Sequence, residues 1–170
     1  MIDNDFVEEI KIVKKMFLHE DELIKAFEII KLNMIDLGVK VLDNDKIFWA
    51  KTIEDNLNGK DFYFYLVYLN EEIVGFIELI KNNGIFIVCE VQLSNEVKRS
   101  KTILKVIKFL FECEELKNEN EIQFSILKNN IMSNKTFTHL GGKIILETEN
   151  KYRYSLLKNK VINYLSKFKI

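Results

Sequence analysis

A strand, a turn and a helix follow one another between Ile85 and Phe111, and this succession limits the fold strongly. An apolar, β-branched run extends from Ile85 to Leu93, and the polar turn Ser94–Glu96 follows it. Apolar residues then recur every three or four positions, as on the buried side of a helix. These residues are Ile103, Val106, Ile107, Leu110 and Phe111. The pattern predicts a buried strand that leads into an amphipathic helix.

Lysines occupy the opposite side of the same predicted helix. The start of a helix carries partial positive charge and free N–H groups, so nearby basic residues favour a phosphate site. Lysines opposite an apolar stripe are equally typical of a solvated helix face with no ligand. The sequence leaves both interpretations open. The residues concerned are Lys98, Lys101, Lys105 and Lys108.

The composition is that of a globular protein with one domain. The chain has 170 residues, of which 48% are hydrophobic and 30% charged, and no linker or repeat interrupts it. We therefore expect one domain over residues 1–170. The formal net charge of −1 argues against a general nucleic-acid partner. Any phosphate binding must then be local.

The cysteines and histidines do not have the spacing of metal ligands. Cys89 and Cys113 are the only cysteines, and His19 and His139 are far apart in the sequence. We expect no metal and no disulfide, as in a reducing compartment. The first residues are acidic, and no apolar run approaches the ~20 residues of a membrane span. The prediction is a cytoplasmic protein without a membrane span.

Hydrophobic periodicity along the whole chain predicts an α/β protein. We expect a mixed, mostly antiparallel sheet of about seven strands, flanked by about four helices and a C-terminal helix. The predicted strands cover residues 9–17, 62–69, 73–80, 85–93, 121–127, 143–147 and 152–157. The predicted helices cover residues 19–37, 45–56, the segment after the turn to 111, 131–140 and, within a basic tail at 158–170, residues 159–168.

This order of elements resembles the GNAT superfamily of acyl-CoA N-acyltransferases over nearly the whole chain. The segment Leu93–Leu104 is similar to the family's strand, turn and pyrophosphate loop. That loop has Gln or Arg, two residues, Gly, one residue, and Gly or Ala. Small residues are missing here, whichever register is chosen: Thr102 and Leu104 take their places if Arg99 is first, and Lys101 and Ile103 if Lys98 is first.

A second segment, Asn130–Lys143, is similar to the family form Asn-x-x-Ser-x-Lys followed by Leu-Gly-Gly-Lys. The resemblance implies that Asn130 and Ser133 face coenzyme A. The alternative is that these two side chains only cap the first turn of a helix. The family commonly has a tyrosine acid at the position of Phe137, which cannot donate a proton.

The resemblance also implies where acetyl-CoA lies. The strand that ends at Leu93 should splay from the strand that begins near Ile122, and the pantetheine should bond to strand backbone in the gap. A backbone N–H of Val91–Leu93 would polarise the acyl oxygen. The cofactor-binding residues implied are Val91, Gln92, Leu93, Lys98, Arg99, Ser100, Lys101, Thr102, Ile103, Leu104, Asn130, Ser133 and Phe137.

Two carboxylates are candidates for the catalytic base. Glu90 is the first choice, because a carboxylate in an apolar strand should be partly desolvated and have a shifted pKa. Glu78, in the preceding strand, is the second. Either residue could instead face solvent or pair with a lysine. The acid could be water, Tyr152 or Tyr154.

The resemblance implies an N-acetyltransferase that moves an acetyl group from acetyl-CoA to a primary amine of a small molecule or protein. The lost glycines and Phe137 keep open a non-catalytic GNAT-like module that binds CoA weakly or not at all and acts as a binding or regulatory module. The basic tail leaves a third interpretation, in which it docks on a partner or an anionic membrane surface. The alternative, which is commoner than membrane binding, is that it packs against its own domain or against a second copy in a homodimer. Trp49 and Phe62–Tyr65 are either core residues or the lining of an acceptor pocket.

Overall fold

All strands among the described residues lie in one seven-stranded sheet. The computed structural model describes residues 9–98 and 101–168. The strand order is β1-β2-β3-β4-β5-β7-β6, and the pairs are antiparallel except for the parallel β4–β5 pair. The strands are β1 (Ile10–Lys15), β2 (Phe62–Leu69), β3 (Glu72–Asn82), β4 (Ile85–Leu93), β5 (Glu121–Leu127), β6 (Lys143–Glu147) and β7 (Lys151–Leu157).

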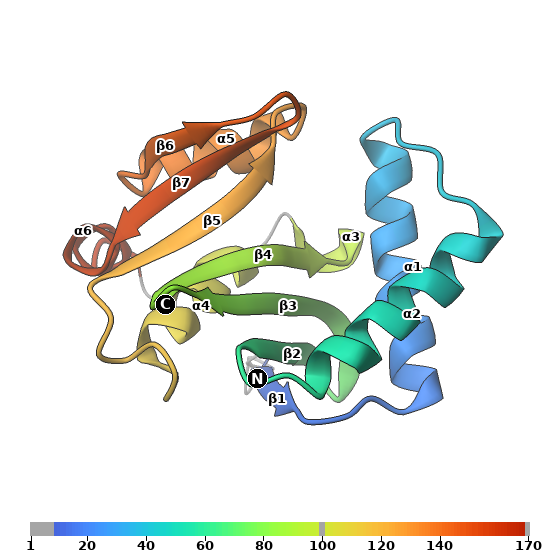
Figure 1. The fold of residues 1–170 in the computed structure, drawn as a ribbon. Coiled ribbons are helices and arrows are strands. Elements are labelled where there is room, and N and C mark those ends of the chain that lie inside the picture. Colours follow the sequence, from blue (N-terminus) through green and yellow to red (C-terminus); the bar gives the residue numbers. More distant parts are fainter. Residues whose placement is uncertain (1–8, 99–100, 169–170) are drawn as a thin grey trace, which may run out of the picture.

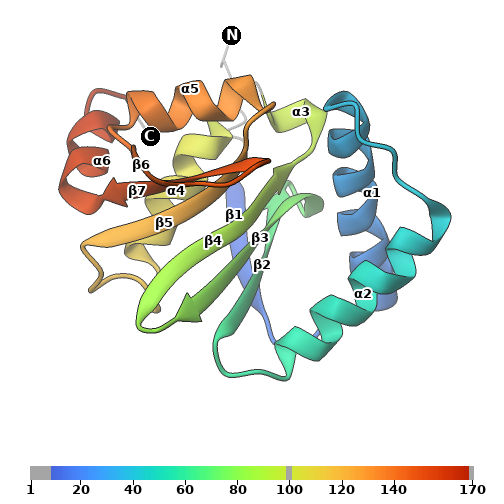
Figure 2. The ribbon, with the colours of Figure 1, turned by 45° about the horizontal axis from the view of Figure 1, so that its top comes forward.

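Six helices flank this sheet in the part of the chain that the structure describes. Two of them cover one face of the sheet, and the longer ones that follow β4 lie on the other face (Figures 1 and 2). The helices are α1 (Glu20–Asp36), α2 (Asp43–Leu57), α3 (Asn95–Lys98), α4 (Thr102–Glu112), α5 (Ile131–His139) and α6 (Lys158–Leu165). The predicted fold class is confirmed.

The two faces of the sheet hold separate hydrophobic cores, because successive side chains of a strand point to opposite faces. The smaller core joins α1 and α2 to β2 and β3 through residues such as Leu23, Ile53 and Phe64. The larger core joins α4, α5 and α6 to most of the strands through residues such as Ile107 and Phe124. The α1–α2 face is therefore covered over β2 and β3.

The helix predicted after the turn is two helices. The Ser94 carbonyl accepts hydrogen bonds from the backbone N–H groups of Val97 and Lys98, which close the short helix α3. The helix α4 starts only at Thr102, with Lys101 at its N-cap. The prediction of one basic face from Lys98 to Lys108 is therefore wrong for Lys98. The apolar periodicity of α4 hides the break, since Val97 is buried too.

The C-terminal helix packs against its own domain. Val161 and Leu165 of α6 are buried and belong to the larger core. Ile162 of the same helix is 53% exposed, and the helix ends at Leu165 rather than at the predicted residue 168. No helix within the described residues is long and apolar enough to cross a membrane.

Candidate functional site

The parallel ladder between β4 and β5 stops after two residue pairs. Ile87 pairs with Gln123 and Val88 with Phe124, and no later residue of β4 pairs with β5. The two strands then diverge toward their carboxyl ends (Figure 1). We call this divergence the splay. It leaves the β5-facing backbone edge of Cys89–Leu93 without a sheet partner, as the sequence resemblance led us to expect.

A β-bulge lies where the splay begins. In the β3–β4 ladder Glu78 pairs with Glu90 and Leu79 with Val88, so Cys89 is the extra residue of β4. A bulge bends its strand and increases the local twist. The bulge thus accounts for the departure of β4 from β5. It also places Glu78 and Glu90 side by side on adjacent strands.

Glu78 is the most perturbed carboxyl group of this region. Its Oε1 atom is buried and has no hydrogen-bond partner among the described residues. Burial, and secondly the charge of Glu90, raise the pKa of Glu78 to about 8. A hydrogen bond with Trp49 of α2 and the charge of Lys151 oppose this shift. A carboxyl group with such a pKa exchanges protons near neutral pH.

Glu90 belongs to a chain of side-chain hydrogen bonds that reaches α1. The Gln92 Nε2 atom donates to Glu90 Oε2 at 2.6 Å. Asn33 of α1 donates through Nδ2 to Gln92 Oε1 at 2.7 Å and to the Leu93 carbonyl at 3.1 Å. These bonds fix the orientation of the Glu90 carboxylate. Gln92, predicted as a cofactor-binding residue, acts here as a link between α1 and Glu90.

Two cations of β7 face the same region from the other side of the splay. The charges of Lys151 and Arg153 lower the pKa of the Cys89 thiol, although burial and the nearby glutamates raise it overall. The Arg153 Nε atom is buried without a hydrogen-bond partner in the described chain. Neither cation forms an ion pair with Glu78 or Glu90. The site therefore combines an acidic pair with two cations that have no ion-pair partner among the described residues.

The residues of the predicted phosphate turn are only partly in view. Arg99 and Ser100 lie outside the described residues, as does Lys169 of the basic tail. Lys98 Nζ lies 3.6 Å from Asp36 Oδ2, and Lys101 Nζ lies 5.8 Å from the centre of the Phe168 ring. The other predicted residues of this region are partly or fully buried; they are Val91, Leu93, Thr102, Ile103 and Leu104.

The predicted residues of α5 serve the protein's own structure. Asn130 is the N-cap of the helix, and its Oδ1 accepts from the Ser133 backbone N–H at 3.1 Å. Phe137 is buried between the rings of Phe124 and Tyr154, with ring centres 4.7 and 5.9 Å away. The Asn130 side chain therefore caps the helix, whereas Ser133 takes part in this cap through its backbone N–H. A Phe137 contact with a ligand would require the core to open.

The two candidate tyrosine acids differ in environment. The Tyr154 hydroxyl donates to Asn134 Oδ1 at 3.0 Å, and the residue is buried. Tyr152 is half-buried, with the Lys128 ammonium 5.1 Å from its ring centre. Both rings lie on the sheet face opposite Glu78, because the tyrosines pack into the larger core. Neither hydroxyl faces the acidic pair.

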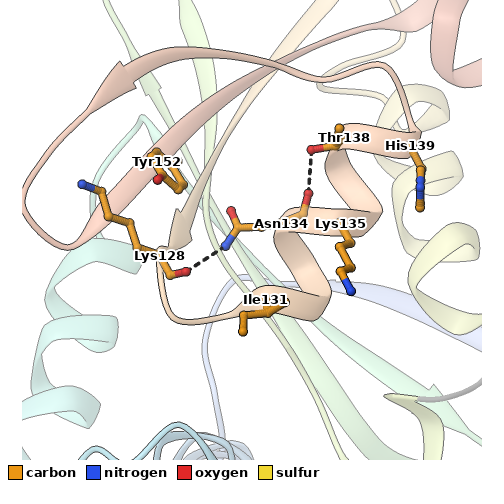
Figure 3. A pocket seen from close by; sticks show the side chains of 7 residues that line it. All are labelled: Lys128, Ile131, Asn134, Lys135, Thr138, His139 and Tyr152. Atoms are coloured by element: carbon orange, nitrogen blue, oxygen red, sulfur yellow. Dashed lines mark hydrogen bonds between the residues drawn. The ribbon is translucent and has the colours of Figure 1, made fainter.

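A pocket of about 300 Å³ opens beside α5 (Figure 3). Most of its polar groups already have partners: Asn134 Nδ2 donates to the Lys128 carbonyl, Thr138 Oγ1 donates to the Asn134 carbonyl, and Lys128 Nζ is 2.6 Å from Glu147. It is also on the opposite face from the acidic pair. The lining residues are Lys128, Ile131, Asn134, Lys135, Thr138, His139 and Tyr152.

Sequence reasoning missed the parts of the site that depend on long-range contacts. Asn33, Lys151 and Arg153 were not among the candidates, and Trp49 was assigned only to a core or an acceptor pocket. The alternation of basic residues with tyrosines in β7 was a usable signal for a charged face. Within the described ranges, no group of three His, Cys, Asp or Glu residues is arranged to hold a metal ion.

Comparison with known proteins shows the fold. The sequence matches no protein-family model and no curated protein. Among solved structures, an acetyltransferase from Thermus thermophilus superposes with a TM-score of 0.72 at 10% identity, over 87% of this chain and 96% of that one. PaiA N-acetyltransferase from Thermoplasma acidophilum, solved with coenzyme A, superposes with a TM-score of 0.62 at 15% identity, over 86% of this chain and 99% of that one.

A third similar structure is the Campylobacter jejuni N-acetyltransferase PseH in complex with acetyl coenzyme A. Its TM-score is 0.61 at 21% identity, over 88% of this chain and 99% of that one. Other similar structures include acetyltransferases of the GNAT family from Desulfovibrio desulfuricans and Staphylococcus aureus. The GNAT fold predicted from the sequence is confirmed. At these identities the likeness concerns the fold alone.

Proposed function

Because the chain has the GNAT fold, we propose that it is an acetyl-CoA-dependent N-acetyltransferase acting on a primary amine of a small molecule or protein. The observation that carries this proposal is the splay, which opens beside Glu78 and Glu90 after only two β4–β5 pairs. Two structures of this fold were solved with coenzyme A or acetyl coenzyme A. The β5-facing backbone edge of Val91–Leu93, which has no sheet partner among the described residues, is the part of this chain suited to bind a pantetheine amide.

The reaction needs a base for the amine, and the acidic pair supplies it. With its pKa raised to about 8, Glu78 can take a proton from the attacking amine near neutral pH. The neutral amine nitrogen then bonds to the acyl carbon while the carbon–sulfur bond breaks, and the second proton that the nitrogen loses passes through water to the leaving thiolate. Glu90, held by Gln92, places a negative charge beside Glu78 and the ammonium ion. We assign the base to Glu78, which the sequence placed second, and positioning of the amine to Glu90.

Two further groups complete the proposed chemistry. A backbone N–H of Val91–Leu93 donates to the acyl oxygen, where negative charge develops. Water protonates the leaving thiolate, since Phe137 has no acidic proton and the Tyr154 hydroxyl is bonded to Asn134. The phosphates of acetyl-CoA lie at the start of α4, near Lys98 and Lys101.

A non-catalytic CoA-binding module is the second candidate. It is favoured by Phe137, which occupies the position where the family commonly carries its acid, and by the absence of small residues in the phosphate turn. The two candidates differ in turnover. A non-catalytic module binds acetyl-CoA without releasing CoA in the presence of any amine.

Thermal unfolding with acetyl-CoA, CoA and dephospho-CoA tests the binding step. Ligand at 100 times its dissociation constant should stabilise the protein by about 2.7 kcal/mol. Changing Arg99 and Lys101 to Ala should weaken binding and its dependence on salt, whereas changing Lys105 and Lys108 should have less effect. Equal losses of CoA affinity from the two pairs of substitutions would favour a diffuse basic face without a phosphate site. No shift at millimolar acetyl-CoA would contradict both candidates.

Release of CoA tests turnover. Glu78→Gln should lower kcat by about 10²- to 10⁴-fold, and the rise of the wild-type rate through pH 8 should disappear. Glu90→Gln should also reduce the rate, with a larger part of the loss in KM. Glu72→Gln, an exposed residue of the same strand as Glu78, is the matched control and should retain full activity. Unchanged rates in both active-site variants would remove the acidic pair from the mechanism.

A further inference from the structure

The two cations of β7 lack partners in the part of the chain that the structure describes. Lys151 and Arg153 alternate with Tyr152 and Tyr154, whose rings pack into the larger core, so the cations lie on the opposite face of the sheet. Their side chains form no hydrogen bond or ion pair with residues 9–98 or 101–168. The Arg153 Nε atom is buried as well.

A buried guanidinium N–H without a partner is unfavourable, because it has lost its hydrogen bonds to water. Exceptions of this kind in folded proteins call for an explanation, such as a role in binding a ligand. The planar guanidinium of Arg153 presents its N–H groups in a fork that matches a carboxylate or a phosphate. Lys151 adds a second positive charge on the same face. This part of β7 is thus arranged for an oxyanion.

The cations are on the same face as the acidic pair but separate from it. Lys151 is close enough for its charge to counteract the effect of burial on Glu78, yet no ion pair joins them. The splay lies between β4, which carries Glu90, and β5, whose Ser125 pairs with Arg153. A molecule with one end at Glu78 therefore extends across the splay toward β7.

We propose that the acceptor is an amine that also carries an oxyanion, a carboxylate or a phosphate, which Arg153 and Lys151 bind. The inference rests on the proposed function, because the acidic pair places the amine end of this molecule. The phosphates of acetyl-CoA do not explain the cations. We assign those phosphates to the start of α4, and this helix packs into the larger core, on the face of the sheet opposite the cations.

The test compares amines that differ only in their distal group. Amino alcohols of graded chain length are matched with aminoalkanoates and aminoalkyl phosphates, and CoA release is measured for each. The wild type should have a higher kcat/KM for one of the two anionic series than for the alcohols. Which series is preferred identifies the oxyanion. Equal kcat/KM for all three series would overturn the proposal.

Variants separate the oxyanion site from the rest of the enzyme. Arg153→Met should raise KM for the preferred anionic amine about 10- to 100-fold, as expected for a charged hydrogen bond, and leave the alcohols unchanged. Arg153→Lys keeps the charge without the fork and should show an intermediate rise. Lys143→Met removes an exposed cation of neighbouring β6 and should have no effect. Equal losses for anionic and neutral amines would overturn the proposal.

Failure of the proposed function has a different signature. If no amine gives CoA release, titration calorimetry with the same three series still measures the anionic group directly. Binding of an anionic amine that Arg153→Met abolishes and Lys143→Met retains would support the oxyanion site in a non-catalytic protein. Absence of such a difference between the two variants would overturn it.

Discussion

Replacing Glu78 by glutamine should stabilise the protein at neutral and alkaline pH. Burial, followed by the charge of Glu90, raises the pKa of this carboxyl group from its ordinary value of 4.5 to about 8. Between these pH values the folded protein keeps the proton, whereas the unfolded chain loses it. The wild type thus has its full stability below pH 4.5 and loses part of it as the pH rises toward 8. Glutamine has almost the same shape and does not ionise.

The size of the effect follows from the shift. One pKa unit corresponds to about 1.4 kcal/mol, so the wild type should lose about 3 kcal/mol relative to Glu78→Gln between pH 4.5 and 7. The difference should level off near about 5 kcal/mol above pH 8, where both states of the wild type are ionised. Near pH 4.5 the two proteins should be almost equally stable.

Urea unfolding at pH 4.5, 7 and 9 measures this difference. Glu22 and Glu115, whose hydrogen bonds lower their pKa values against the opposing effect of burial, act alike in both proteins and cancel. The exposed Glu72→Gln variant should follow the wild type at each pH. Parallel curves for Glu78→Gln and the wild type would refute the reasoning. A variant that gains stability and loses activity would mark Glu78 as a functional rather than a structural residue.

Three further substitutions and one control test the framework of the protein by urea unfolding. Gly75→Ala should destabilise the protein by about 1 to 3 kcal/mol, since a Cβ atom there would lie 2.4 Å from the Gln92 carbonyl oxygen; unchanged stability would show that β3 and β4 can separate freely. Asn134→Ala should destabilise the protein by about 1 to 3 kcal/mol, because the Leu127 carbonyl and the buried Tyr154 hydroxyl lose their hydrogen bonds to Asn134. The control Asn129→Ala removes one exposed hydrogen bond to the Leu37 carbonyl and should have a smaller effect. Lys15→Met should lower stability by about 2 kcal/mol at pH 7 and little near pH 2. Lys15 pairs with Glu22 and helps to lower its pKa, and this pair stabilises the protein only while Glu22 is ionised. An equal loss of stability at both pH values would contradict this.

The strand bounds were largely predictable, because local signals define them. The bounds of β2, β4, β5 and β6 agree with the prediction, since each apolar or alternating run ends at a polar turn. The break between α3 and α4 was not predictable, because Val97 and Val106 both face the core and continue one apolar pattern. Periodicity reports which side of a helix is buried. It does not report whether the backbone between two buried residues is helical.

The assignment of roles within the site was less predictable, since it depends on packing between distant segments. Glu78 and Glu90 look alike in sequence, each a lone carboxylate in an apolar strand. Only the structure places Trp49 of α2 against Glu78 and links Glu90 to α1 through Gln92. The position of Arg153 near Cys89 of β4 depends on the splay between β4 and β5.

The short β4–β5 ladder also has a mechanical consequence. Among residues 9–98 and 101–168, only the pairs Ile87–Gln123 and Val88–Phe124 connect the β1–β4 half of the sheet to the β5–β7 half through backbone hydrogen bonds. The larger core, to which Ile107 of α4 belongs, contains residues of both halves and connects them through apolar contacts. Apolar contacts are non-directional, so the halves can tilt about this short ladder while every strand keeps its other partners. The sheet can act as a hinge whose axis passes beside the bulge at Cys89.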